Sequence, residues 1–319
     1  MMNERKLSEP PPLLQRDSGR SRPRSVLPGK TYLVTRRCTQ RTFLLRPSRV
    51  VNELFLYCLA YAAQRFSIRV HAFAVLSNHF HLVVTDPLAK LPAFMEWLDG
   101  MVARCLNAYY GRWENFWAPG TYSRVELLTD EAVLEKMVYT LTNPVAAGLV
   151  AFGTQWPGLR SSTLRRGPWR IVATRPEFFF RKNGGLPDNV ELVVERPPGY
   201  TDVGAREFGE LFDRAVRGKE EEIRSSLEID GRRFLGKKGV LRQSRFDSPM
   251  SREPRRGLNP QVAVRDKWKR IEALQTLRQF RNDYADAFKR FRAGVHDATF
   301  PVGTYWMRIH CGVRCYVPP

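Results

Sequence analysis

Two histidines, His79 and His81, stand one residue apart in HAFAVLSNHFHLVVTDP, residues 71–87. Alternate residues of a β-strand point to the same face, which would place these two Cα atoms roughly 7 Å apart. Imidazole nitrogens are common metal ligands, so such a pair can bind one divalent cation. Two surface histidines would show the same spacing. The pair alone therefore does not decide between a metal site and an exposed strand.

A candidate nucleophile, Tyr139, lies in EAVLEKMVYTLTN, residues 131–143. The apolar residues of this stretch fall on one arc of a helix, which predicts the face that packs on the core: Val133, Leu134, Met137, Val138 and Leu141. Tyr139 falls outside that arc, on the side of Glu135 and Asn143. A tyrosine that only caps a helix flank, with its hydroxyl in water, would fit as well.

Asn143 supplies a further polar group at the end of the same stretch. Pro144 disfavours α geometry in the residue before it, so we expect the helix to end at Asn143. Its side-chain oxygen is then a candidate third ligand beside the two imidazoles.

Alternating and helical patterns predict the elements that position these residues. From Lys30 to Asn143 the order is β-α-β-β-α-β-α, which matches a ferredoxin-like split βαβ arrangement with one extra helix. Ser77-Asn78 reads as a hairpin turn in which Asn tolerates positive φ. On the third strand we expect the face of Phe80 to pack and the histidine face to be displayed. The predicted fold class is α+β, with an antiparallel sheet and helices.

Outside this region the patterns are weaker. Residues 1–29 are rich in Pro, Arg and Ser and predict a disordered basic arm. The compact catalytic unit would span 30–163. Residues 164–319 predict a basic, mainly helical C-terminal region of unknown role, with helices over 205–228 and 263–291.

The charge balance points to a polyanionic partner. The chain of 319 residues has 52 Lys and Arg against 32 Asp and Glu, a formal net charge of +20. We favour nucleic acid over a membrane, because no apolar run reaches the ~18 residues of a spanning helix. The N-terminus lacks an apolar signal segment, and five scattered cysteines give no disulfide framework. We therefore expect a cytoplasmic protein.

Several basic and aromatic residues are candidate DNA contacts, although a solvated or packing role explains each equally well. They are Arg104, Arg124 and Lys136, the cluster Arg242, Arg245, Arg252, Arg255 and Arg256, and the aromatics Trp113 and Trp117. His310, Cys311 and Cys315 have ligand-type side chains but lack a fourth partner for zinc.

The two stretches around His79 and Tyr139 together resemble the single-tyrosine HUH transposases, in particular the REP-associated tyrosine transposases of bacteria. The resemblance rests on HAFAVLSNHFHLVVTDP and on MVYTLTNPVAAGLVAFGTQWPGLRSS, and covers roughly residues 30–163. It implies an HUH endonuclease-like fold, with His79, His81 and Asn143 as metal ligands and Tyr139 as the nucleophile. The family often carries Trp-Gln-x-Arg before the fourth strand, whereas Ala118 and Pro119 follow Trp117 here.

Such a resemblance implies an enzyme that cuts and rejoins single-stranded or hairpin DNA through a 5′-phosphotyrosine intermediate. It implies Mg²⁺ or Mn²⁺, association with the nucleoid, and no nucleotide cofactor; the chain has no G-x-x-x-x-G-K-[ST] run. A homodimer is left open. Two alternatives remain: a domesticated, catalytically silent nucleic-acid-binding protein, and a metal-dependent hydrolase that uses water and has no need of Tyr139.

Overall fold

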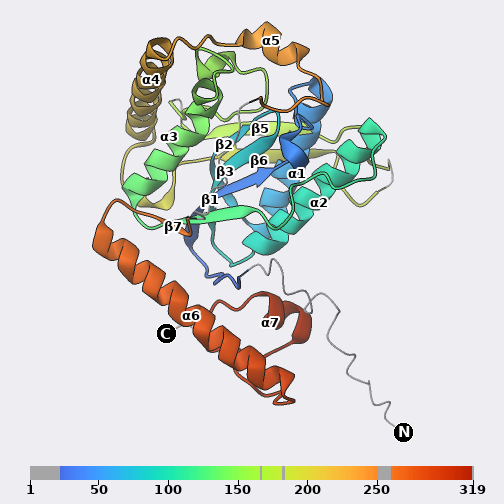
Figure 1. The fold of residues 1–319 in the computed structure, drawn as a ribbon, viewed down its shortest axis with the longest axis vertical. Coiled ribbons are helices and arrows are strands. Elements are labelled where there is room, and N and C mark those ends of the chain that lie inside the picture. The colour runs from blue at the N-terminus through green and yellow to red at the C-terminus, as the bar shows by residue number, and fades with distance from the viewer. Residues whose placement is uncertain (1–21, 166, 182–183, 251–259, 318–319) are drawn as a thin grey trace.

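The computed structural model describes residues 22–165, 167–181, 184–250 and 260–317. Within them a seven-stranded mixed sheet has the order β5-β6-β2-β3-β1-β4-β7, with helices packed around it (Figure 1). The predicted α+β class is confirmed. The strands are β1 (Lys30–Arg37), β2 (Arg69–Val75), β3 (His79–Asp86), β4 (Ser123–Leu127), β5 (Trp169–Thr174), β6 (Asn189–Val194) and β7 (Val262–Ala263). The helices are α1 (Arg49–Phe66), α2 (Leu91–Tyr110), α3 (Asp130–Ala146), α4 (Ala205–Ile229), α5 (Gly236–Arg242), α6 (Lys267–Arg292) and α7 (Trp306–Cys311).

The four central strands lie in the order β2-β3-β1-β4, and each neighbouring pair is antiparallel. This is the strand order of a split βαβ fold, as the sequence predicts. The register places Thr35 of β1 opposite His81 of β3, and Arg37 opposite His79. Residues directly opposite each other share a face, so these four side chains belong to one side of the sheet.

Helices α1 and α2 cover the other side. The Ser48 side chain caps α1 by accepting a hydrogen bond from the Val51 amide at 3.2 Å. Phe55 of α1 meets Phe80 of β3 with ring centroids 5.1 Å apart, so the predicted apolar face of the third strand is packed. Tyr109, in the last turn of α2, is 51% exposed.

Helix α3 covers the histidine side of the sheet and runs further than predicted. Thr129 caps its start by accepting from the Ala132 amide at 3.3 Å. The helix does not end at Asn143 but continues through Pro144 to Ala146. Proline costs little here because it lies in the final turn, which is closed by hydrogen bonds from Ala147 to the Asn143 carbonyl and from Leu149 to the Pro144 carbonyl. Asn143 therefore keeps helical geometry.

The sheet continues past residue 163, which the sequence patterns did not indicate. β5 and β6 form an antiparallel hairpin, and β6 joins β2 in parallel at Val70 and Val194. β7 joins β4 at the other edge. Both strands of the hairpin are short and lie between turn-rich segments, so their alternation was too weak to recognise. The long helices α4 and α6 do form close to the predicted ranges, and the C-terminal region is largely helical.

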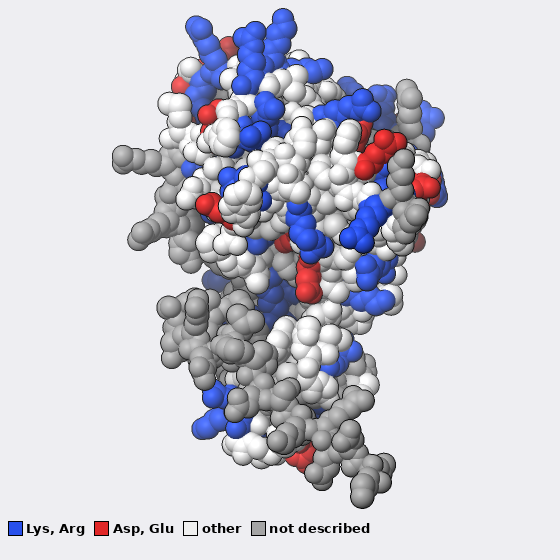
Figure 2. Space-filling view, turned by 90° about the vertical axis from the view of Figure 1, so that its right-hand side faces the viewer, with Lys and Arg blue, Asp and Glu red and all other residues white. Residues whose placement is uncertain are grey.

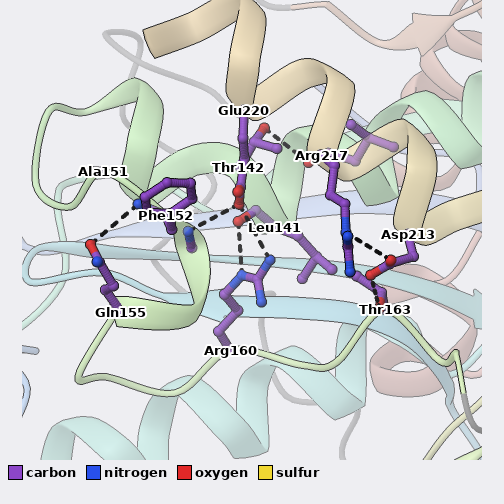
Figure 3. Close-up of polar contacts among 12 residues, drawn as sticks. Leu141, Thr142, Ala151, Phe152, Gln155, Arg160, Thr163, Asp213, Arg217 and Glu220 are labelled. Atoms are coloured by element: carbon purple, nitrogen blue, oxygen red, sulfur yellow. Dashed lines mark hydrogen bonds and ion pairs between the residues drawn. The ribbon is translucent and has the colours of Figure 1, made fainter.

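A buried polar network joins α4 to the segment that follows α3 (Figure 3). The Arg160 Nε atom donates to the Leu141 carbonyl at 2.9 Å, and an Arg160 Nη2 atom lies 3.8 Å from Glu220 Oε1. The same Glu220 oxygen accepts from the Gly153 amide at 3.0 Å. Glu220 of the C-terminal region is thus connected through Arg160 to the helix that carries Tyr139.

The ends of the described chain pack on this body or beside it. Residues 22–29 belong to the stretch predicted to be disordered, but Val26 is buried and its amide donates to the Gly303 carbonyl at 2.9 Å. The rest of that predicted arm, 1–21, lies outside the described residues. α6 and α7 share a small apolar cluster around Phe300 and Met307, at the lower end of the molecule in Figure 1. Among the described helices, none has the length and apolar character needed to cross a membrane.

Candidate active site

His81 stands at the centre of the histidine side of the sheet and is held on both ring nitrogens. Its Nδ1 atom lies 2.7 Å from Thr35 Oγ1, and its Nε2 atom lies 3.3 Å from Asn143 Nδ2. An amide nitrogen can only donate, so Nε2 carries the lone pair and Nδ1–H donates to Thr35. Burial, with a smaller contribution from His79, holds the pKa of His81 well below its usual value. The ring is therefore neutral and presents a ligand nitrogen.

His79 is oriented by the residue before it. Its Nδ1 atom lies 2.7 Å from Asn78 Oδ1, and Asn78 Nδ2 donates to the Arg41 carbonyl at 3.0 Å. Because the amide oxygen accepts, His79 Nδ1 must donate. In the neutral ring Nε2 is then the nitrogen that can bind a cation. The two imidazole centroids are 4.8 Å apart, with the ring planes at 82°.

The turn before His79 differs from the expected one. Ser77 and Asn78 do connect β2 to β3, closed by a hydrogen bond from the Leu76 amide to the His79 carbonyl at 2.8 Å. Neither residue has positive φ, which the sequence reading had allowed for Asn78. Asn78 therefore does not serve the turn by adopting a positive φ; its side chain orients His79.

The histidine face is also less open than predicted. His81 is only 4% exposed, because α3 lies across this side of β2 and β3. The expectation of a displayed face was wrong for His81, while His79 is half-buried at the edge of the helix. Because α3 lies over this face, it places polar side chains of its own beside His79 and His81.

Tyr139 and Asn143 come from α3, one helical turn apart. The Tyr139 ring lies 5.2 Å from the His81 ring between centroids, in an edge-to-face arrangement at 71°. Asn143 is buried, whereas Tyr139 is 41% exposed. The structure thus brings together the four residues His79, His81, Tyr139 and Asn143, with the phenol at the border between the site and solvent.

The charged groups beside Tyr139 largely offset one another. Lys136 Nζ lies 5.9 Å from the Tyr139 ring centroid and 2.9 Å from Glu135 Oε1. Glu135 is also 3.4 Å from Arg265 Nε, and its hydrogen bond to Lys136 lowers its pKa from the usual value. Lys136 is near enough to contact a phosphate at the site, but it already has a carboxylate partner.

The other predicted DNA contacts lie elsewhere. Arg124 pairs in register with Val34, so its side chain lies on the opposite side of the sheet from His81, over the Tyr32 ring at 4.8 Å. Arg104 is exposed on α2, which packs with α1 on that opposite side. Trp117 is buried against Phe80, while Trp113 is 92% exposed.

The remaining candidate residues lie in the C-terminal region. His310 lies against Trp306 at 4.9 Å between ring centroids, and Cys311 is exposed. Among the described residues no group of three or more His, Cys, Asp or Glu side chains could hold a metal. Arg252, Arg255 and Arg256 lie outside the described residues.

The donor set at His79, His81 and Asn143 fits a single divalent cation. It offers two imidazole rings, each oriented by a partner on its Nδ1 atom, and one side-chain amide. Imidazole ligation favours transition metals such as Mn²⁺ over Mg²⁺, which prefers oxygen.

Two residues that orient the histidines, Thr35 and Asn78, were not predicted from the sequence. Thr35 is 46 residues from His81, and only the strand register shows that they are opposite each other. Asn78 was assigned only to a turn. Its position directly before His79 could have indicated that its side chain is a hydrogen-bond partner of that histidine.

Comparison with known proteins adds little to what the side chains of the site show. No protein-family model and no curated protein matches the chain. One similar solved structure is described as a REP-associated tyrosine transposase bound to a REP hairpin; it is 18% identical, with a TM-score of 0.39, over 52% of this chain and 100% of that one. Another, from Deinococcus radiodurans R1, is described as a candidate transposase; it is 18% identical, with a TM-score of 0.28, over 38% and 95%. TM-scores this low carry no argument, so function is inferred from the side chains.

Proposed function

We propose that this protein is a transposase-type enzyme that cuts and rejoins single-stranded DNA with Tyr139 as its nucleophile. The observation that carries the proposal is the placement of the Tyr139 ring 5.2 Å from His81, on the same helix as Asn143. A phenol from α3 and two imidazoles from β3 meet on the side of the sheet that α3 covers. The motifs around both residues resemble single-tyrosine transposases.

His79, His81 and Asn143 would hold the divalent cation, Mg²⁺ or Mn²⁺. When bound, the cation polarises the scissile phosphate and offsets the charge that develops on it. Thr35 and Asn78 keep the two rings in the tautomer that ligates. The exposed side of Tyr139 leaves room for a DNA strand to approach from solvent.

The reaction is a transesterification. The Tyr139 phenol loses its proton as its oxygen attacks phosphorus. The bond from phosphorus to the 3′ oxygen breaks, and that oxygen leaves as a 3′-hydroxyl after taking a proton. The product is a 5′-phosphotyrosine. Attack by another 3′-hydroxyl reverses the step and joins strands, so no nucleotide cofactor is consumed.

The test is covalent capture. Protein, Mn²⁺ or Mg²⁺, and a pool of labelled single-stranded and hairpin oligonucleotides of random sequence should give a protein–DNA adduct that survives denaturation. Tyr139→Phe should abolish the adduct while DNA binding persists. Tyr109→Phe is the matched control, because Tyr109 is similarly exposed but on α2. Strand cleavage that continues in Tyr139→Phe would show a hydrolase that uses water; binding without any cleavage in the native chain would show a silent binding protein.

A further inference from the structure

Residues 235–247, called the rim segment here, run along the end of the sheet that carries His79. At one end, the Leu235 and Gly236 amides donate to the carbonyls of Gly148 and Leu149, at 3.0 and 2.9 Å. These two acceptors directly follow α3. The segment therefore starts beside the helix that carries Tyr139 and Asn143.

The far end of the rim segment reaches the turn before His79. Gln243 Oε1 accepts from Ser77 Oγ at 3.1 Å, and the Gln243 carbonyl accepts from Arg46 Nη1 at 2.8 Å. Between the two ends, Val240 of α5 packs into an apolar cluster with Ala74 of β2 and Val145 of α3. The rim segment thus borders the candidate active site from α3 to the β2–β3 turn.

The solvent side of this segment is basic. It holds Lys237, Lys238, Arg242 and Arg245 against the single acid Asp247, and the first three are exposed. None of these four cations forms an ion pair with a carboxylate in the described part of the chain. In Figure 2, Lys and Arg side chains gather at the top of the molecule, the height at which Figure 1 places α5. The three exposed cations, Lys237, Lys238 and Arg242, are suited to a phosphate backbone.

An aromatic side chain stands next to these charges. Phe246 is 71% exposed, and its ring lies 4.7 Å from the Arg245 guanidinium, which in turn lies 5.1 Å from the Tyr110 ring. A tight turn holds it: the Ser244 amide donates to Asp247 Oδ2 at 2.8 Å, and the Phe246 amide donates to Ser244 Oγ at 3.2 Å. An exposed, fixed ring backed by arginine is a surface on which an unpaired base can stack.

We propose that the rim segment binds the single-stranded DNA that leads to the candidate active site, with Lys237, Lys238 and Arg242 on phosphates and Phe246 stacked on a base. The inference rests on the proposed function for its direction, since the strand would continue to His79 and Tyr139. Stacking requires an unpaired base, so duplex DNA gains only the phosphate contacts.

Binding is measured separately from chemistry, in the Tyr139→Phe background, by fluorescence anisotropy of an oligothymidylate of about 20 nucleotides and of a duplex of equal length. Phe246→Ala should weaken single-strand binding about tenfold and leave duplex binding within about twofold. Phe246→Trp, which keeps an aromatic ring at this position, should bind the single strand about as tightly as the native residue does. The logarithm of the binding constant falls linearly as the logarithm of the salt concentration rises, by ~0.7 per phosphate contact on a single strand. The triple change Lys237→Ala, Lys238→Ala, Arg242→Ala should make this slope less steep by about 2.

The matched control removes the same charge from the far end of α6, through Lys289→Ala, Arg290→Ala and Arg292→Ala, and should change the salt slope by less than half as much. Equal effects of the two triple changes, or single-strand binding that Phe246→Ala leaves intact, would overturn the inference. If rim changes weaken binding but the native chain forms no covalent adduct, the rim surface stands and the proposed chemistry falls. If the adduct forms and rim variants bind as the native chain does, the chemistry stands and the rim surface falls.

Discussion

The Nε2 atom of His81 lies 3.3 Å from the amide nitrogen of Asn143, although 62 residues separate them in the chain. This contact joins the third strand to the helix that lies across it, and it places both groups out of water. The helix then fixes Tyr139, one turn before Asn143, over the edge of the His81 ring. A single strand–helix contact therefore determines how the phenol, the amide and the imidazoles are arranged.

Thr35 should matter to metal binding although it touches no metal. Thr35→Val keeps the shape of the side chain but removes the oxygen that accepts from His81 Nδ1, so the ring loses the partner that fixes its tautomer. We expect Mn²⁺ affinity to fall about 10- to 100-fold, as measured by isothermal titration calorimetry.

The control for that change is Thr31→Val on the same strand. The Thr31 hydroxyl is hydrogen-bonded to the Thr85 hydroxyl at 2.7 Å, four residue pairs away from Thr35. This variant should bind Mn²⁺ within about twofold of the native chain, because the contact it loses is remote from the histidines. Equal losses of affinity in the two variants would contradict a role for Thr35 in orienting His81.

The link between Arg160 and Glu220 should be a stability element. Both side chains are about nine-tenths buried, and burial lowers the pKa of Arg160 from its usual value while Glu220 opposes that shift. Glu220→Gln would leave a buried guanidinium without its carboxylate. We expect the free energy of unfolding in urea to fall by about 3 kcal/mol.

Glu222→Gln on the same helix serves as the comparison. Glu222 pairs with Lys219 on the surface at 2.6 Å, so its loss should cost less than about 1 kcal/mol. If both variants lose the same stability, the buried network contributes nothing beyond a surface pair.

His71 should make the fold sensitive to acid. It is buried at the bulge in β2, where Nδ1 lies 3.0 Å from the Glu195 carbonyl and Nε2 lies 2.8 Å from Thr85 Oγ1. Burial lowers the pKa of His71 to about 4. Below pH 6.5 His71 becomes protonated in the unfolded chain, whereas in the folded chain it stays neutral down to about pH 4. The free energy of unfolding therefore falls as the pH drops through this window.

The size of this effect can be measured in urea at pH 7.5 and 4.5. Proton linkage of a group with these two pKa values predicts a loss of about 2.5 kcal/mol between the two conditions. His71→Gln cannot titrate, so its loss should be smaller by about that amount. The same pH dependence in both proteins would show that other groups cause it.

Much of the structure of residues 30–163 was predictable because its signals are local. Helical spacing identified the buried face of α3 through residues such as Met137 and Leu141, and alternation put His79 and His81 on one face. The placement of Tyr139 outside the core arc of α3 also followed from spacing alone. These features depend on a few neighbouring residues, and tertiary packing did not override them.

What was missed depends on contacts between distant segments. The register that sets Thr35 against His81, and the β5–β6 hairpin that adds to β2, arise from pairing across the chain. The helix end was misjudged because Pro144 is tolerated in a last turn whose remaining carbonyls find other donors. Burial of His81 under α3 could not be read from the strand itself.

The most direct test of the central claim is to find which residue becomes attached to DNA. After incubation with Mn²⁺ and single-stranded DNA, nuclease trimming and trypsin digestion, the peptide Met137–Arg160 contains Tyr139 as its one tyrosine. Mass spectrometry should detect that peptide carrying a nucleotide through a phosphate ester, and should not detect it after metal chelation. Cleaved DNA with this peptide unmodified, or the nucleotide on a different residue, would contradict the account.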